Sequence, residues 1–429
     1  MNLVSIIFFL ICAGIVLSCL KRGADVLSPA RVFGFVWALS FGLAELKMSG
    51  LQHEWSTESW IILLLGPLSF LLGLFALYVM NLNSQLLSLD EIRSRCRLSR
   101  VDNNRLFGVT LVFFFLFVVA YAAIVLTGHE IPLLSSRPGL ARAKFQMFGI
   151  GLLIHNLTEV GFFATLYFVL VGHEKGRKGI LAFATIVCFL MYAITLQRFP
   201  LAVTALMMVT LVHYMTRHLR ARVTAFYLGV GVVFLLAISR LRASAIFVYF
   251  VYVGSKMRID PSFAWVTEPY MYFVMNLEMF ARSVDRLEEF TYGYYTFDFV
   301  TALTGLKHWL SDYFGLVETP FLISGYNTYS AFWTYYRDFG VLGVFLISLI
   351  GGVVVGSLYY SLRQAPRLST LSAYGVAVFL MALSVFNSQF GFLWFVYNVV
   401  LLFVTLRWIE RPSGAAVQDG TEGVAAHTI

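Results

Sequence analysis

A single arginine stands in a very short connection between two apolar stretches of the chain. The connection reads Gln197-Arg198-Phe199-Pro200, and a proline at this place suits the first turn of the helix that follows. Arg198 is therefore expected at a helix N-terminus, where unpaired N–H groups and the helix dipole favour an anion. A guanidinium at such an end can bind a pyrophosphate or a carboxylate. The alternative is an arginine at the membrane interface that reaches lipid headgroups.

Two more arginines, Arg240 and Arg242, follow the next apolar stretch and are predicted to emerge on the same side as Arg198. Positive charges on the outer side are not needed to orient a membrane protein. Their presence there favours an anionic ligand, with anchoring at the interface as the alternative. We expect the three arginines to form an anion site.

The stretch that these arginines open, residues 240–338, is a long loop rich in aromatic side chains. Aromatic residues make up 26 of its 99 positions, which is unlike a disordered segment. Loops this long usually carry function. Aromatic rings can stack on sugar faces, while Tyr, Asn and carboxylate groups hydrogen-bond sugar hydroxyls. The alternative is that the aromatic residues only pack against lipid. We predict an ordered cap that holds a site.

The elements that position these residues are apolar helices. Hydrophobic residues make up 59% of the 429 positions and charged residues only 13%, about half the share found in soluble domains. Repeated apolar runs near the roughly 20-residue length that crosses a bilayer predict an all-α, polytopic membrane protein. Eleven spans are expected, at 2–20, 31–47, 58–80, 106–127, 150–172, 179–196, 199–215, 223–239, 339–360, 371–386 and 391–407.

The distribution of Lys and Arg predicts which loops face the cytoplasm. With the C-terminus inside, 18 of the 31 basic residues fall in cytoplasmic segments, and 8 of the other 13 lie in the long loop. Long translocated loops count little in the positive-inside rule, so the loop is placed outside. The expected organisation is spans 1–8 over 1–239, an external cap over 240–338, spans 9–11 over 339–410 and a disordered tail over 411–429.

Three helical pieces are expected in the cap, over residues 264–285, 297–313 and 328–337. Glu268 and Arg282 are polar members of the first piece. The second carries an apolar stripe at helical spacing, which is predicted to pack in a core. The stripe consists of Phe299, Leu303, Leu306, Leu310 and Tyr313.

Within the fifth predicted span, His155 and Glu159 lie one helical turn apart. Polar groups inside a membrane are costly and therefore informative. Because residues four apart share a helix face, we expect a hydrogen-bonded pair that fixes helix packing. A role in the site is the alternative.

Conventional enzyme motifs are absent from the sequence. It contains no P-loop, no GxSxG, no HExxH and no Asp-x-Asp, and its four cysteines form no CxxC or Cys/His cluster. We therefore expect neither a metal nor a nucleotide or other cofactor. The net charge of +8 follows the membrane topology and does not indicate nucleic-acid binding.

The end of the cap reads GYNTYSAFWTYYRDFG, from Gly325 to Gly340. An Asn-Thr-Tyr element here precedes a Tyr-x-Asp-hydrophobic-Gly-x-x-Gly element at the start of a span. With the array of spans, the long external loop late in the chain and the arginine of the tight hairpin, this resembles the Wzy-type O-antigen polymerases, which polymerise bacterial oligosaccharide repeat units. The matching positions are Asn327, Thr328, Tyr329, Tyr336, Asp338, Phe339, Gly340, Gly343 and Arg198. The architecture matches over most of the chain, the motifs only in these two places.

The resemblance implies a glycosyltransferase of the bacterial inner membrane that acts on the periplasmic face. The donor would be a glycan on undecaprenyl pyrophosphate, and the acceptor a hydroxyl at the non-reducing end of a new lipid-linked repeat unit. It also implies a fold similar to lipid-dependent membrane glycosyltransferases, contacts with membrane lipid, and a chain-length regulator protein as a further partner.

Within this expectation the three arginines would stabilise charge on the departing pyrophosphate, through charge-assisted hydrogen bonds and without a metal. Asp338 or Glu268 would accept the proton of the acceptor hydroxyl. Asp338 can instead form a structural ion pair with the adjacent Arg337. The expected glycan-binding residues are Asn327, Tyr329, Tyr336, Arg337 and Arg282.

Three alternatives stay open. An O-antigen ligase shares the donor and relies on a loop histidine, and His308 is the one histidine of the long loop. A lipid-linked glycan flippase or exporter needs polar residues along a path through the spans, and several spans are nearly free of them. A membrane-embedded acyltransferase usually has a histidine in a buried span, as His155 would be.

Overall fold

The computed structural model describes residues 2–21, 23–97, 101–145, 147, 149–171, 174–217, 223, 229, 233, 245–287, 289–313, 323, 326, 328–388 and 391–410. Within these ranges the regular structure is helical, and the β contacts are two isolated bridges, Ser49 to Met257 and Val101 to Glu410. The predicted all-α fold is confirmed for this part of the chain.

Five helical segments are long and apolar enough to cross a membrane. They are α3 (Thr57–Met80), α5 (Asn103–Leu126), η2 (Ile150–Asn156) continued by α7 (Leu157–Leu170), α8 (Lys175–Ala193) and α15 (Ala331–Gln364). The shorter apolar helices are α1 (Leu3–Cys19), α2 (Pro29–Ala44), α9 (Phe199–Met215), α16 (Leu368–Leu383) and α17 (Leu393–Ile409). Together they coincide with ten of the predicted spans, whereas the predicted span 223–239 falls almost wholly outside the described residues. The number of eleven spans stays a prediction.

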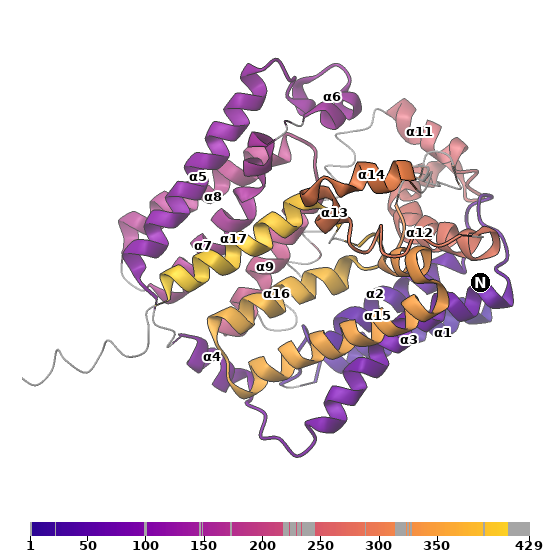
Figure 1. Ribbon diagram of the computed structural model, residues 1–429, viewed down its shortest axis with the longest axis horizontal. Helices are drawn as coiled ribbons and strands as arrows, with labels where there is room; N and C mark the ends of the chain where they lie inside the picture. The colour runs from indigo at the N-terminus through magenta and orange to yellow at the C-terminus, as the bar shows by residue number, and fades with distance from the viewer. Residues whose placement is uncertain are drawn as a thin grey trace, which may run out of the picture.

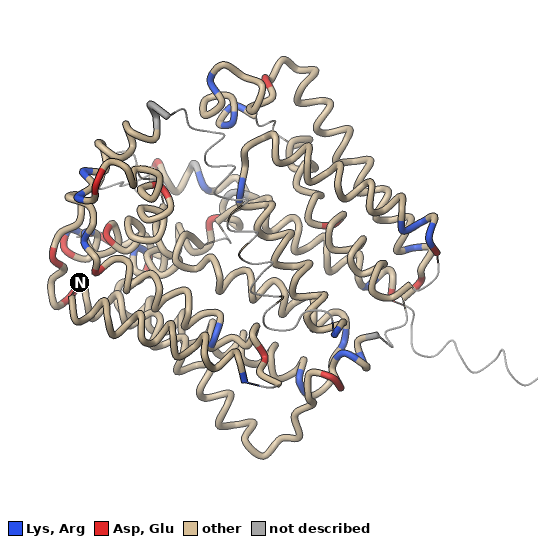
Figure 2. Tube along the Cα trace, turned by 180° about the vertical axis from the view of Figure 1, so that it is seen from behind, with Lys and Arg blue, Asp and Glu red and all other residues tan. Residues whose placement is uncertain are grey.

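The connections between these helices gather at two opposite ends of the molecule (Figure 1). At one end the N–H of Leu87 bonds the carbonyl of Arg363 at 2.8 Å, and at the other the N–H of Leu133 bonds the carbonyl of Ile194 at 3.0 Å. Charged residues concentrate at the same two ends, with few along the middles of the helices (Figure 2). Each of these two bonds joins a pair of loops that was predicted to share a side of the membrane.

The described part of the predicted cap is largely helical and lies at one of these ends (Figure 1). Its elements are α11 (Ala245–Gly254), η3 (Pro261–Val266), α12 (Thr267–Arg286), α13 (Asp298–Thr304) and α14 (Leu306–Tyr313). The predicted helix over 264–285 is confirmed as α12, which packs on α2 and α3. This helix is the element that the site is built on.

The predicted helix over 297–313 is instead two short helices. Gly305 takes a φ of 74° between α13 and α14, so no continuous helical face forms. Leu303 is 64% exposed and Tyr313 is 71% exposed. The prediction that this stripe packs in a core is wrong, because α13 makes its contacts with α14 and α17 while much of the stripe faces outward.

The chain breaks sharply at Gly340 inside α15. Gly340 has φ 62° and ψ −151°, a backbone conformation that is essentially restricted to glycine. Three residues later, a Cβ at Gly343 would lie 2.5 Å from the carbonyl oxygen of Tyr335. The Gly-x-x-Gly spacing therefore lets a short helix lie closely against the start of the long one. A short helix over 328–337 that leads into the following span was predicted.

Facing glycines hold the long part of α15 against α3. An added Cβ at Gly73 would collide with the carbonyl oxygen of Leu349, and one at Gly352 with the carbonyl oxygen of Phe70. Small residues are what allow two membrane helices to approach this closely. The contact fixes α15, and with it the short helix that carries residues 336–338.

Candidate functional site

Arg198 occupies the N-cap position of α9, and Pro200 stands in the first turn of that helix. The structure thus places the helix boundary where the sequence predicts it. The turn from α8 into α9 is tight, and Leu196 within it takes a positive φ of 59°. The Arg198 side chain is only 17% exposed, so most of it is covered by protein.

The partners of Arg198 stand in the first two turns of α12. Its Nη2 donates to Glu268 Oε1 at 3.0 Å and to the hydroxyl of Tyr272 at 2.6 Å. Its guanidinium carbon lies 4.8 Å from the centroid of the Tyr272 ring. Because Glu268 and Tyr272 are four residues apart, they share one face of α12. The tight hairpin and the cap helix therefore meet at one polar group.

A second arginine joins this group from α6 (Pro138–Lys144). Burial lowers the pKa of Arg142, and the nearby charge of Arg198 lowers it further. Tyr272 and Glu268 act in the opposite direction. The Nε of Arg142 is buried and has no hydrogen-bond partner among the described residues. Arg198 is ion-paired with Glu268, and Arg142 interacts with both residues electrostatically. With two guanidiniums and one carboxylate, the excess positive charge suits an anion. We call these four residues the Arg198 group.

A buried polar chain runs from the hairpin into the helices. The hydroxyl of Tyr192 donates to Gln197 Oε1 at 2.9 Å and lies 3.1 Å from Nδ1 of His155. Glu159 is fully buried, and neither carboxylate oxygen has a hydrogen-bond partner in the described ranges. The predicted hydrogen bond between His155 and Glu159 is therefore wrong, because His155 turns toward Tyr192 on α8.

The predicted Asn-Thr-Tyr element lies beside the same cap helix. Thr328 Oγ1 donates to Asn276 Oδ1 at 2.6 Å, and Asn276 Nδ2 donates to the carbonyl of Tyr272 at 2.5 Å. Tyr329 is buried and stacks on Trp333, with ring centroids 3.8 Å apart. Asn327 lies outside the described residues. The element thus braces α12 one turn beyond the contact with Arg198.

Asp338 is fully buried at the start of α15. Its carboxylate accepts hydrogen bonds from the hydroxyl of Thr291, from the N–H of Tyr295 at 3.2 Å and from the N–H of Thr296 at 2.6 Å. These bonds fasten the loop that precedes α13. Asp338 therefore lies in a structural junction and has no contact with the Arg198 group among the described bonds.

The two residues before Asp338 serve the same junction. Arg337 Nη1 donates to the carbonyl of Glu289 at 2.7 Å rather than to the neighbouring carboxylate. Tyr336 is buried, and its ring packs 5.7 Å from Phe280 and 6.5 Å from Phe290, measured between centroids. Both side chains hold the short helix to the loop and to α12.

The far half of α12 carries a second polar group, which includes the predicted Arg282. Arg282 Nε donates to the buried Glu278 at 3.1 Å, and the Nδ1 of His53 contacts the same oxygen. His53 is 38% exposed, and its Nε2 lies 3.7 Å from Asp285 Oδ2. Ten helical residues separate Glu268 from Glu278, or about 15 Å along the axis. Arg282 is thus well separated from the Arg198 group.

Of the predicted site residues, the structure brings Arg198 and Glu268 together. Arg240 and Arg242 lie outside the described residues. Sequence reasoning missed Tyr272, although its spacing of four from Glu268 was a usable signal. It also missed Arg142, which was visible only as one of three basic residues in an outer connection.

No family model, no curated protein and no solved structure matches the chain. The class of protein is therefore defined by the fold itself. It is an all-helical protein, over the residues described, with several helices long and apolar enough to cross a membrane.

Proposed function

We propose that the protein is a polymerase of lipid-linked oligosaccharide repeat units in the bacterial inner membrane, with its site on the periplasmic face. The observation that supports this most is the Arg198 group: two arginines, a glutamate and a tyrosine at the cap end of the bundle. Its excess positive charge suits a pyrophosphate, which is the leaving group of an undecaprenyl-pyrophosphate donor.

In the proposed reaction an acceptor hydroxyl oxygen bonds to the anomeric carbon of the donor sugar. The bond from that carbon to the pyrophosphate oxygen breaks, and its electron pair leaves with the lipid pyrophosphate. Arg198 and Arg142 stabilise the charge that develops on the departing phosphates. The hydroxyl proton passes to Glu268, the carboxylate that is ion-paired with Arg198. Arg240 and Arg242 are kept as further pyrophosphate ligands.

The glycan is proposed to lie along the cap. Asp338, the other candidate base, is assigned a positioning role, since its oxygens already accept three hydrogen bonds. Tyr336 and Arg337 act with it through the same junction. Asn327, Tyr329 and Arg282 stay proposed glycan contacts along α12 and the segment beside it.

An O-antigen ligase is the second candidate, and one observation favours it. His53 is a partly exposed imidazole held by the buried Glu278 at the cap end of the molecule. A carboxylate that fixes one nitrogen of a partly exposed imidazole is a common arrangement of a general base, although here the second ring nitrogen lies 3.7 Å from Asp285 Oδ2. The side chain of His308 lies outside what the structure describes.

A deletion strain separates these functions. Gel profiling of its surface polysaccharide should show a band of lipid core that carries a single repeat unit, and the wild-type gene should restore the ladder. Complete loss of the capped core would instead indicate a ligase or a flippase. An unchanged ladder would contradict all three.

A further inference from the structure

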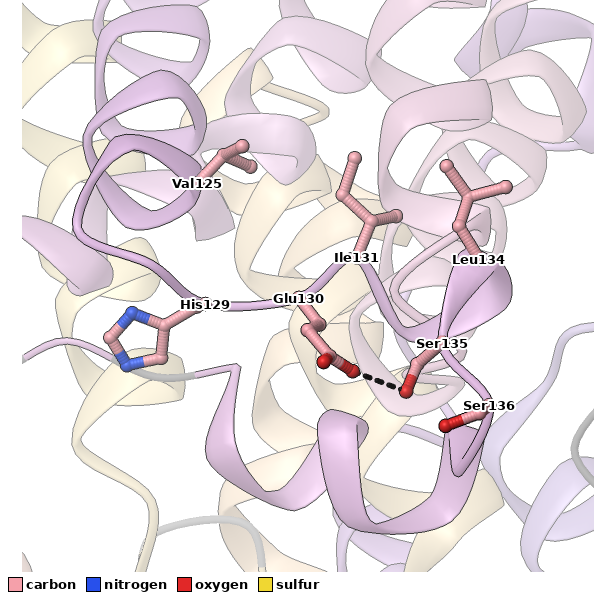
Figure 3. A pocket seen from close by; sticks show the side chains of 7 residues that line it. All are labelled: Val125, His129, Glu130, Ile131, Leu134, Ser135 and Ser136. Carbon is pink, nitrogen blue, oxygen red and sulfur yellow. Dashed lines mark hydrogen bonds between the residues drawn. The ribbon is translucent and has the colours of Figure 1, made fainter.

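A polar pocket opens beside the Arg198 group, on the other side of α6. It lies among the end of α5, η1 (Pro132–Leu134) and α6, and its main lobe has a volume of about 590 Å³. A smaller adjoining lobe of about 410 Å³ shares its lining and is drawn in Figure 3. The polar residues that line the main lobe include Thr127, His129, Glu130, Ser135, Arg137 and Lys144.

The pocket is lined by two cations and one carboxylate. Arg137 and Lys144 have no acidic partner within the described part of the chain. The one carboxylate in the lining, Glu130, accepts a hydrogen bond from Ser135 at 2.5 Å and faces that hydroxyl (Figure 3). The pocket therefore has an excess of positive charge and several hydroxyl groups, which together suit a phosphate.

The rim of the pocket is apolar and open to the surroundings. Leu134 is 77% exposed and Leu140 is 51% exposed, and Leu126, next to the lining residue Thr127, is 86% exposed. Leu126 ends α5, one of the helices long enough to cross a membrane. Exposed leucines beside unpaired basic residues at such a helix end are typical of a surface in contact with lipid headgroups and the start of the acyl chains.

We propose that this pocket binds the phosphate head of a second lipid-linked substrate, the acceptor, while the Arg198 group binds the donor. The inference rests on the proposed function, in which both substrates carry a lipid pyrophosphate. A single anion site cannot hold both heads at once. The pocket residues Arg137, Leu140, Ala141 and Lys144 share one face of α6, whereas Arg142 of the Arg198 group lies on another face of the same helix. α6 has seven residues and is about 10 Å long. An acceptor repeat of a few sugars can bridge such a distance.

Binding stoichiometry tests the proposal on the purified full-length protein. Native mass spectrometry with geranylgeranyl pyrophosphate as the probe should show two bound equivalents in the wild type. Arg137→Gln with Lys144→Gln should lose one equivalent, with roughly thirtyfold weaker binding at that site because two interfacial charges are removed. Both side chains are exposed, so the variant is expected to fold. Arg198→Ala should lose the other equivalent.

The matched control is Lys256→Gln with Arg258→Gln, which removes the same charge from an exposed loop at the same end. It should keep both equivalents. Two equivalents at wild-type affinity in the Arg137/Lys144 variant would overturn the proposal. So would displacement of the probe from this site by equimolar phosphatidylglycerol, which would show a general phospholipid site.

The acceptor pocket and the polymerase activity can be tested separately. If the Arg137/Lys144 variant elongates glycans at the wild-type rate, the acceptor site is wrong and the polymerase proposal stands. If no elongation is found with wild-type protein, the polymerase proposal fails. The loss of one bound equivalent would then still establish a lipid-phosphate pocket, but its assignment to an acceptor substrate would be overturned.

Discussion

Arg198 Nη2 lies 3.0 Å from Glu268 Oε1, and the pair joins segments 70 positions apart in the chain. Arg198 occupies the N-cap position of a bundle helix, and Glu268 stands in the first turn of the cap helix. The ion pair therefore fixes how the cap is seated on the bundle. It also places a carboxylate within reach of the position proposed for the departing phosphate.

Glu268→Gln should separate the chemical role of this carboxylate from its structural role. The amide keeps the size and can still accept a hydrogen bond from Arg198, but it is a very poor proton acceptor. Loss of a general base typically costs roughly a hundredfold to ten-thousandfold in rate. Steady-state elongation of a lipid-linked repeat by purified protein measures the effect. Glu289→Gln, elsewhere in the cap, is the control, and wild-type turnover with Glu268→Gln would assign the residue to structure alone.

Arg142→Gln should lower kcat/KM for the donor lipid while the protein still folds. Its Nε has no partner among the described residues, so the side chain has hydrogen-bonding capacity left for an anion. Losing a hydrogen bond to a charged group corresponds to roughly tenfold to a hundredfold in kcat/KM. The measurement is kcat/KM for the donor lipid, compared with Arg258→Gln as a surface control. Equal values for the two variants would remove Arg142 from the site.

The sequence was sufficient to predict the helices and the position of Arg198, because both depend on local signals. Apolar runs have a characteristic length, and a proline marks the first turn of a helix. The short helix before the ninth span was likewise predicted, but the break at Gly340 that separates it from the long part of α15 was not. Each of the predicted features is decided by neighbours along the chain.

The remaining features depend on contacts between distant segments. Asp338 was a candidate base by its residue type, yet its oxygens are taken up by the loop near Thr291. Arg142 interacts electrostatically with Tyr272, Arg198 and Glu268, which are 56 or more positions away in the chain, and no local pattern reveals this. The apolar stripe that includes Leu303 has helical spacing. This spacing does not reveal which element, if any, covers the stripe, nor that the helix is interrupted at Gly305.

Gly340→Ala should destabilise the protein measurably. Gly340 combines φ 62° with ψ −151°, and an added Cβ would lie 3.0 Å from the ring of Phe290. Forcing a residue with a side chain into such a conformation costs about 1–3 kcal/mol. Thermal unfolding in detergent should show a lower midpoint. Gly14→Ala is the control, because an added Cβ there meets nothing within 4 Å, and it should leave the midpoint unchanged or raise it. Equal midpoints for the two variants would contradict the strained backbone conformation at Gly340.

The buried Asp25 carboxylate should make the stability of the protein depend on pH in the acid range. Burial alone would raise the pKa of Asp25, but hydrogen bonds from His213 at 3.2 Å, Tyr214 at 2.7 Å and Tyr359 at 3.1 Å hold it below the ordinary 3.8. A carboxyl with a lowered pKa stabilises the fold above its unfolded pKa and loses that contribution as the pH falls through the folded value.

As the pH is lowered below 3.8, the thermal unfolding midpoint should therefore decrease more in the wild type than in Asp25→Asn, which lacks the titrating group. At pH 7 the same substitution should lower the midpoint, because it removes a buried charge from its hydrogen-bond donors. Asp90→Asn, at an exposed carboxylate, is the control. Parallel acid profiles for wild type and Asp25→Asn would contradict this role.

The sharpest test compares Arg198→Lys with Arg198→Ala in the elongation of undecaprenyl-pyrophosphate-linked repeats by purified protein in excess EDTA. The described residues contain no group of three His, Cys, Asp or Glu side chains that could hold a metal ion, so the wild type is expected to elongate under these conditions. Both variants should be slower by roughly a hundredfold, because one transition-state contact is worth on the order of 3 kcal/mol and Lys supplies a point charge in place of a planar fork. Wild-type chain lengths with Arg198→Lys, or activity that EDTA abolishes and one metal restores, would contradict an arginine-based pyrophosphate site.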